Sequence, residues 1–135
     1  MDKEKIVEGL NRALERELSV ITQYFWHHVM AKGIESQAVK GIFKGISITE
    51  MKHAEMLAER IDFLGGTPTT KPREIKVGGD LKSMIAADVK AEEEAVDLYK
   101  ELIETCKEDI VTRRMLEGIL ADEEEHLSQF SSLLE

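Results

Sequence analysis

Residues 116–133 read LEGILADEEEHLSQFSSL, and this stretch carries the pattern that decides the fold. Apolar side chains recur at alternating spacings of three and four residues, the period of an α-helix with one face turned toward a core. The middle of that face holds a carboxylate and an imidazole, Glu123 and His126. Residues three apart lie on one side of a helix, one above the other. The segment therefore predicts a core-facing helix with a charged pair halfway along its buried side.

The same pattern occurs in three other segments of the chain. Each has an apolar stripe at helical spacing, interrupted by polar side chains only near its middle. The middle positions are Glu50 and His53 in residues 43–64, Glu17 in residues 10–28, and Glu92 in residues 85–102. The chain therefore has two halves of similar plan, each combining one glutamate with one ExxH motif.

Glycine and proline gather in residues 65–79, GGTPTTKPREIKVGG, which predicts a loop between helical segments. We expect four helices, near residues 3–31, 36–64, 81–106 and from 109 almost to the C-terminus. Short connections make the first two, and the last two, antiparallel pairs. The long connection of about fourteen residues could reach roughly 45 Å when extended. It could therefore return along the bundle and start the third helix at the far end, which predicts an all-α four-helix bundle with a long crossover loop.

The polar residues at the stripe centres point to a metal site. Burying four carboxylates together is prohibitive unless positive charge lies between them. Two divalent cations would supply that charge, with the two ExxH pairs and the two single glutamates as ligands. In this interpretation each half holds one ion, and Glu17 and Glu92 are free to bridge. Oxygen and nitrogen ligands without thiolate suit iron or manganese, and would also accept zinc or cobalt.

Composition narrows the class of protein further. The 135 residues are expected to form one domain, 1–135, and 18 Lys and Arg against 27 Asp and Glu give a formal net charge of -9. Such a surface disfavours nucleic acid and anionic membranes as partners. The single cysteine, Cys106, rules out an internal disulfide and any cysteine-rich metal site. No segment has the apolar run of a signal peptide or a membrane span, so a soluble cytoplasmic protein is expected.

Other polar residues on the stripes have less specific interpretations. Tyr24 is either a redox-active or hydrogen-bonding neighbour of the metals, or a core aromatic whose hydroxyl finds a carboxylate. Asp88 would either orient a ligand or pair with a buried Lys or Arg. His27 is expected at the surface or at an interface.

The chain resembles the bacterioferritins along nearly its whole length. LNRALERELSVITQYFWHHVM, residues 10–30, is similar to the first helix of that family, and EMKHAEMLAERIDFLGGTP, residues 50–68, to its second helix and following loop. DVKAEEEAVDLYKELI, residues 88–103, and RRMLEGILADEEEHL, residues 113–127, resemble the third and fourth helices. The resemblance implies a ferritin-like bundle with six metal ligands: Glu17, Glu50, His53, Glu92, Glu123 and His126.

The resemblance also implies an activity and an assembly. Bacterioferritins are ferroxidases that oxidise Fe(II) with O2 or H2O2 at a site holding two iron ions per subunit, and they store the product inside a hollow homo-oligomer. Met51 matches the methionine that ligates haem, one from each subunit of a dimer. The chain ends soon after its fourth helix, without the family's short fifth helix, so a cage of 12 subunits is expected rather than 24.

Alternative functions remain open at this stage. A rubrerythrin-like peroxidase would reduce peroxide at a di-iron centre without storage, but that family has an extra glutamate where this chain has Ala95. A non-storage di-metal oxidoreductase, such as a manganese catalase, would use the same ligands. A non-catalytic bundle stabilised by zinc would be a monomer or dimer in solution.

Overall fold

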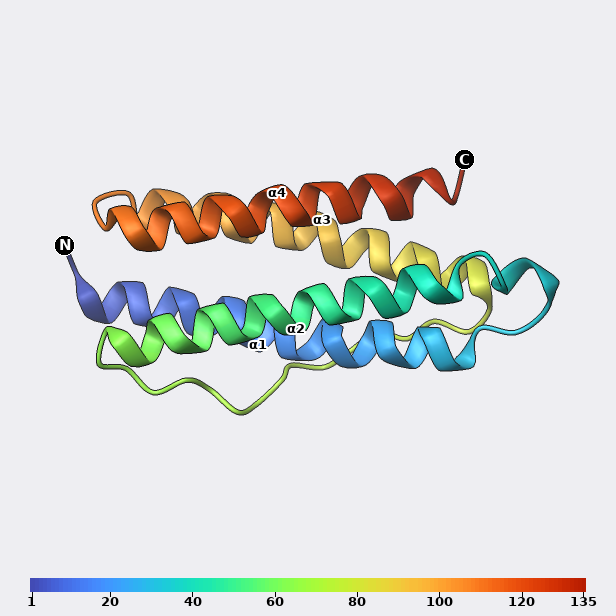
Figure 1. The fold of residues 1–135 in the computed structure, drawn as a ribbon, viewed down its shortest axis with the longest axis horizontal. Helices are drawn as coiled ribbons and strands as arrows, with labels where there is room; N and C mark the ends of the chain where they lie inside the picture. The colour runs from blue at the N-terminus through green and yellow to red at the C-terminus, as the bar shows by residue number, and fades with distance from the viewer.

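The computed structural model describes all residues from 1 to 135 and contains four long helices and no strand, as expected for an all-α bundle (Figure 1). The helices are α1 (Lys3–Met30), α2 (Lys40–Phe63), α3 (Leu81–Thr105) and α4 (Ile110–Ser132), with a short 3-10 helix, η1 (Ile34–Ser36), before α2. Helices α1 and α2 form one antiparallel pair, and α3 and α4 form the other (Figure 1). None of the helices combines the length and apolar character that crossing a membrane requires.

Side chains at the helix ends explain where three of the helices begin. The Asp2 carboxylate accepts a hydrogen bond from the backbone N–H of Lys5, at 3.2 Å. Asp80 and Asp109 make the equivalent bond at the starts of α3 and α4. Each carboxylate thus satisfies a backbone donor that has no partner within the first helical turn.

The start of α2 differs from the sequence prediction. Ser36 was expected to begin this helix, but α2 begins at Lys40. The Ser36 hydroxyl donates backward to the Gly33 carbonyl at 2.7 Å, so it closes the 3-10 turn and does not cap the helix that follows. Gly33 has φ +92°, a conformation that favours glycine, and this residue turns the chain toward α2.

The crossover between α2 and α3 runs back along α1, so that α3 begins at the end of the bundle where α2 began (Figure 1). Polar side chains of α1 hold it there. Asn11 accepts from the Thr69 N–H at 2.8 Å, and the Ser19 hydroxyl bonds both backbone groups of Arg73. Further along, Gln23 accepts from the Lys76 N–H at 3.1 Å. The predicted return of the loop is thereby confirmed.

The apolar core is divided into two parts along the bundle axis. One part contains Leu10, Leu57 and Leu116, and the other contains Phe43 and Phe130. The residues at the centres of the four stripes lie between these two parts. The bundle therefore encloses a polar layer with apolar packing on both sides of it along the bundle axis.

Candidate metal centre

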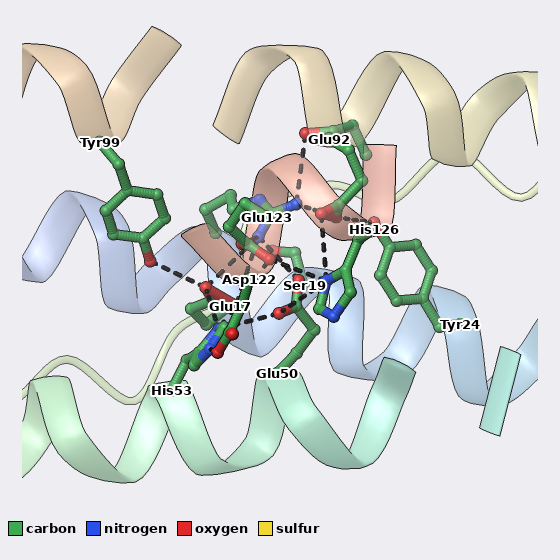
Figure 2. A network of polar contacts seen from close by, with 12 residues as sticks. Glu17, Ser19, Tyr24, Glu50, His53, Glu92, Tyr99, Asp122, Glu123 and His126 are labelled. Carbon is green, nitrogen blue, oxygen red and sulfur yellow. Dashed lines mark hydrogen bonds and ion pairs between the residues drawn. The ribbon is translucent and has the colours of Figure 1, made fainter. Parts of the chain in front are cut away.

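The structure brings all six predicted ligand residues together at the middle of the bundle (Figure 2). Each helix contributes one glutamate, and the two ExxH helices, α2 and α4, also contribute a histidine. All four carboxylates are fully buried, and the two histidines are nearly so. The i, i+3 spacing in α2 and α4 places each histidine beside its own glutamate, since both side chains then share one helix face.

The six side chains form two overlapping groups that could each hold a metal ion. One group is Glu17, Glu50, His53 and Glu123, and the other is Glu50, Glu92, Glu123 and His126. Within each group the candidate ligand atoms all lie within 4.8 Å of one another. Glu50 and Glu123 belong to both groups. The expectation that Glu17 and Glu92 bridge is therefore wrong, because these two side chains lie on opposite sides and the ExxH carboxylates lie between them.

The two imidazoles are oriented by carboxylates. His53 Nδ1 lies 3.0 Å from Glu50 Oε1, and His126 Nδ1 lies 3.0 Å from Glu123 Oε1. The other nitrogen of His53, Nε2, lies 2.7 Å from Asp122 Oδ2 at the rim of the centre. The two rings stack with centroids 6.4 Å apart. A histidine held from one nitrogen by a carboxylate presents the other in a fixed direction, as metal-binding histidines commonly do.

Two tyrosine hydroxyls complete the inner surface of the centre (Figure 2). Tyr99 donates to Glu17 Oε1 at 2.8 Å, and Tyr24 donates to Glu92 Oε2 at 2.6 Å. Both side chains are fully buried. Tyr24 therefore has the carboxylate partner that sequence analysis allowed for it. Each of the two outer glutamates is held by one phenol, so both halves of the centre follow the same plan.

Arg16 is the residue that sequence reasoning missed. Its side chain is fully buried, and Nη1 donates to Glu50 Oε2 at 2.9 Å and also contacts Glu123. Nη2 donates to Glu92 Oε2 at 2.7 Å. A signal was present in the sequence, since Arg16 follows Ala13 by three residues and precedes Val20 by four, and both are buried.

Burial and mutual repulsion shift the ionisation of the centre. Burial, and then the charges of Glu17 and Glu123, raise the pKa of Glu50 well above its usual value. Burial acts to lower the pKa of Arg16, but the carboxylates around it, led by Glu123, more than offset this and raise it well above normal. The guanidinium therefore stays charged.

The imidazoles respond to the same carboxylates. Burial acts to lower the pKa of His53, yet the Glu17 carboxylate 3.4 Å from Nδ1, the bond to Asp122 and the other negative charges raise it to about 9. Burial also acts to lower the pKa of His126, but the bond to Glu123 and the Glu92 carboxylate 3.4 Å away outweigh it and raise the pKa to about 10. The centre therefore attracts cations strongly, whether protons or metal ions.

The donor set fits a pair of divalent ions. Glu50 Oε1, Glu92 Oε1 and His53 Nδ1 are buried and make no well-aligned hydrogen bond, although His53 Nδ1 lies 3.0 Å from Glu50 Oε1; Arg16 Nε is likewise unpaired. Buried polar atoms almost always make such a bond, so unpaired oxygens and a nitrogen converging on one point are typical of metal ligands. Four carboxylates and two imidazoles without thiolate match the preferences of iron, manganese or zinc.

Other polar residues lie away from the centre. Met51 lies on α2 with its side chain 56% exposed, so it does not take part in the cluster. Asp88 pairs with His27, whose Nδ1 lies 2.8 Å from Asp88 Oδ2, and with Gln23. Neither a metal ligand nor a Lys or Arg contacts Asp88, and His27 is fully buried, so both earlier interpretations are corrected. His27 Nε2 also bonds the Val77 carbonyl, which ties the crossover loop to α1.

Known proteins share the sequence pattern of this chain. The family model described as a ferritin-like domain matches residues 7–135. The chain belongs to the ferritin-like family. Ferritin-like relatives include the bacterioferritin of Desulfovibrio desulfuricans, 36% identical over 134 residues that cover 97% of this chain and 75% of that protein. The bacterioferritin of Streptomyces coelicolor is 34% identical over 97% of this chain and 80% of its own length.

A solved ferritin-like structure agrees with the fold in detail. The ferritin-like, diiron-carboxylate protein from Bacillus anthracis superposes with a TM-score of 0.95 and is 33% identical. The alignment covers 100% of both chains. The predicted resemblance to ferritin-like proteins and bacterioferritins is thus confirmed, and so is the ferritin-like topology with its long crossover.

Proposed function

We propose that this chain is a ferroxidase that acts as a single ferritin-like di-iron domain, with Glu17, Glu50, His53, Glu92, Glu123 and His126 as metal ligands. The observation that carries the proposal is the convergence of four fully buried carboxylates and two histidines on one point, with unpaired ligand atoms facing it. The similarity to bacterioferritins and to a protein described as a diiron-carboxylate protein supports iron as the metal.

Paired iron explains why the site has two overlapping halves. Each Fe(II) gives up one electron, so two held close together can reduce O2 to H2O2, with two protons taken up as two Fe(III) form. The same pair could instead reduce H2O2 to two water molecules, again with two protons taken up as two Fe(III) form. Glu50 and Glu123 belong to both halves and would hold the ions at a fixed separation. Glu17 with His53, and Glu92 with His126, would bind the outer sides.

The protein supplies position, charge and exclusion of water. The tyrosine hydroxyls of Tyr24 and Tyr99 keep the outer glutamates in place. His53 and His126 would have to give up their protons to solvent when they become ligands. Apolar packing on both sides of the layer limits access to solvent.

A titration of Fe(II) into chelator-treated protein under anaerobic conditions, followed by air or peroxide, tests the ferroxidase assignment. We expect saturation near two iron ions per chain and rapid oxidation on adding the oxidant. Glu50→Gln should slow oxidation by more than about tenfold, whereas Glu55→Gln, an exposed position on the same helix, should not. Oxidation that is unchanged in Glu50→Gln would refute the assignment. Which oxidant reacts faster would separate an O2-dependent ferroxidase from a peroxidase.

Storage requires assembly into a cage, and the proposed homo-oligomer has a surface suited to it. Phe25, Ile48 and Phe63 are large apolar side chains of α1 and α2 that are 59%, 42% and 73% exposed. Exposed apolar side chains spread along one helix pair favour contact with another subunit. A twelve-subunit cage remains our prediction for its size, and elution near twelve times the 15.3 kDa chain mass would support it. A cytoplasmic location also remains a prediction.

Haem is a further part of the proposal. Met51 lies on the same helix pair, and its exposure would allow a haem to be held between Met51 and its equivalent in a second subunit. Addition of haemin should produce the absorption spectrum of a bis-methionine haem. Met51→Leu should abolish it, whereas Met56→Leu, a similarly exposed methionine on α2, should not. Equal binding by both variants would exclude this role for Met51.

A further inference from the structure

Arg16 makes an unusual set of contacts for a residue that lies in a proposed metal centre. Its two terminal nitrogens reach the carboxylates of all four helices: Glu17, Glu50, Glu92 and Glu123. It is the only arginine or lysine among the fully buried residues. The guanidinium is therefore a counter-charge shared by the four glutamates. It bonds the same carboxylate groups that metal ions would use, through Oε2 of Glu50 and Glu92, while Oε1 of both stays unpaired.

Charge and space both oppose simultaneous occupation. Two divalent ions would carry the four positive charges that balance four carboxylates, so an added guanidinium would leave the centre with excess positive charge and would repel the ions. Each ion would also need Glu50 and Glu123, and Arg16 Nη1 contacts both. Arginine cannot relieve the conflict by losing its proton, because its pKa is far too high.

We propose that Arg16 is a displaceable internal counter-cation, which holds the four carboxylates together until two metal ions replace it. The inference rests on the metal centre of the proposed function, and it adds that metal binding is a competition with a group of the protein itself. The affinity of the site is thereby set lower than its ligands alone would give, so half-filling of the centre needs a higher metal concentration.

The structure offers a place for the displaced side chain. Arg16 Nη2 already donates to the Ala91 carbonyl at 3.2 Å. Ala91 lines a cleft of about 100 Å³ together with Ser19 and Val20, the residues one turn beyond Arg16 on α1. The wall of this cleft includes the carboxylates of Glu74 and Glu94 as well as basic side chains. A rotation about the Arg16 side-chain bonds would move the guanidinium away from the glutamates without opening the bundle.

Three variants separate this inference from a purely structural role. Arg16→Gln removes the charge and keeps a shorter polar side chain, and Arg16→Lys keeps a charge with fewer donors. Arg12→Gln alters an exposed arginine one turn earlier that pairs only with Glu101. Two properties would be measured: the affinity of chelator-treated protein for Co²⁺ and Zn²⁺ by calorimetry, and the thermal unfolding temperature with and without Zn²⁺.

Arg16→Gln should raise the affinity for metal ions but lower the unfolding temperature of the metal-free protein. Its affinity for the ions should rise by at least about tenfold, while its unfolding temperature without metal should fall, since four buried carboxylates lose their counter-charge. Saturating Zn²⁺ should remove most of the difference in unfolding temperature. Arg16→Lys should lie between, and Arg12→Gln should match the wild type. Equal or weaker metal binding by folded Arg16→Gln would overturn the inference.

A measurement on the wild type covers the case in which Arg16→Gln does not fold without metal. The ¹⁵N resonance of the Arg16 guanidinium should move, and its protons should exchange faster with water, as Zn²⁺ is added. A resonance that stays fixed while two ions bind would overturn the inference and leave the proposed ferroxidase intact. Failure of both the wild type and Arg16→Gln to bind any ion would overturn both.

Discussion

His53 Nε2 lies 2.7 Å from Asp122 Oδ2, and this contact joins α2 to α4 at the edge of the buried centre. His53 is 2% exposed, whereas the Asp122 side chain is 48% exposed. The outer carboxylate thus fixes the ring from solvent while Nδ1 faces the glutamates. A partly exposed acid therefore orients a buried imidazole.

Replacing Asp122 should weaken metal binding with little effect on stability. Asp122→Ala removes the partner of His53 Nε2, so the ring is free to rotate, and affinity for Co²⁺ should fall about 10- to 100-fold. The exposed neighbour Glu125 on the same helix provides the control, as Glu125→Ala changes surface charge equally without contacting His53. If both variants bind Co²⁺ alike, Asp122 does not orient the ligand.

Metal affinity should keep rising with pH above the range in which an ordinary histidine loses its proton, near pH 6.5. The carboxylates raise the pKa of His53 to about 9 and that of His126 to about 10, so both imidazoles are protonated at neutral pH without metal. Each must release its proton before it can bind an ion. Calorimetric titrations with Zn²⁺ in buffers of different ionisation enthalpy should show proton release at pH 7. Binding without proton release would contradict these pKa shifts.

The same pKa shifts predict that the stability of chelator-treated protein falls as the pH rises, whereas its metal affinity increases. Both histidines have a folded-state pKa above the usual 6.5, so their protonation stabilises the fold. This contribution is fully present below about pH 6.5 and is lost as the pH rises through about 9 to 10. The unfolding temperature should therefore fall over that range, and a rising one would count against the assignment.

The hydroxyl groups of Tyr24 and Tyr99 should contribute similar amounts to the free energy of unfolding. Tyr24→Phe and Tyr99→Phe each remove a hydroxyl that donates to a buried glutamate, at 2.6 and 2.8 Å. Hydrogen bonds to charged groups contribute roughly 1.5–3 kcal/mol, so each variant should lower the free energy of unfolding by about that amount. Urea denaturation of chelator-treated protein measures this directly. Changes below about 0.5 kcal/mol in both variants would show that the carboxylates find other donors.

The crossover loop should depend on Ser19 for its position. The Ser19 hydroxyl accepts from the Arg73 N–H at 2.7 Å and donates to the Arg73 carbonyl at 3.0 Å. Ser19→Ala should accelerate cleavage by trypsin after Arg73 several-fold, because local opening exposes the loop more often. Thr22→Ala is the control, since the Thr22 hydroxyl bonds only the Leu18 carbonyl of its own helix. Identical cleavage rates would show that other contacts hold the loop.

Helical periodicity was sufficient to predict the bundle and to bring six polar residues together, because the period determines which side chains share a buried face. The roles of individual carboxylates were not predictable in this way. Glu50 and Glu123 lie between the halves because of how the helices are rotated against one another. Arg16 is buried by contacts with glutamates from three other helices, which a helical pattern within α1 does not reveal. The backward bond of Ser36 likewise depends on the local turn.

Anomalous X-ray diffraction from crystals grown with Zn²⁺ or with Fe(II) under anaerobic conditions tests the central claim most directly. We predict two peaks per chain, about 3.5–4 Å apart as in other paired metal sites. One should lie beside Glu17 and His53 and the other beside Glu92 and His126, with Glu50 and Glu123 between them. A single peak, or peaks outside this group of six residues, would contradict the assignment of a di-metal centre.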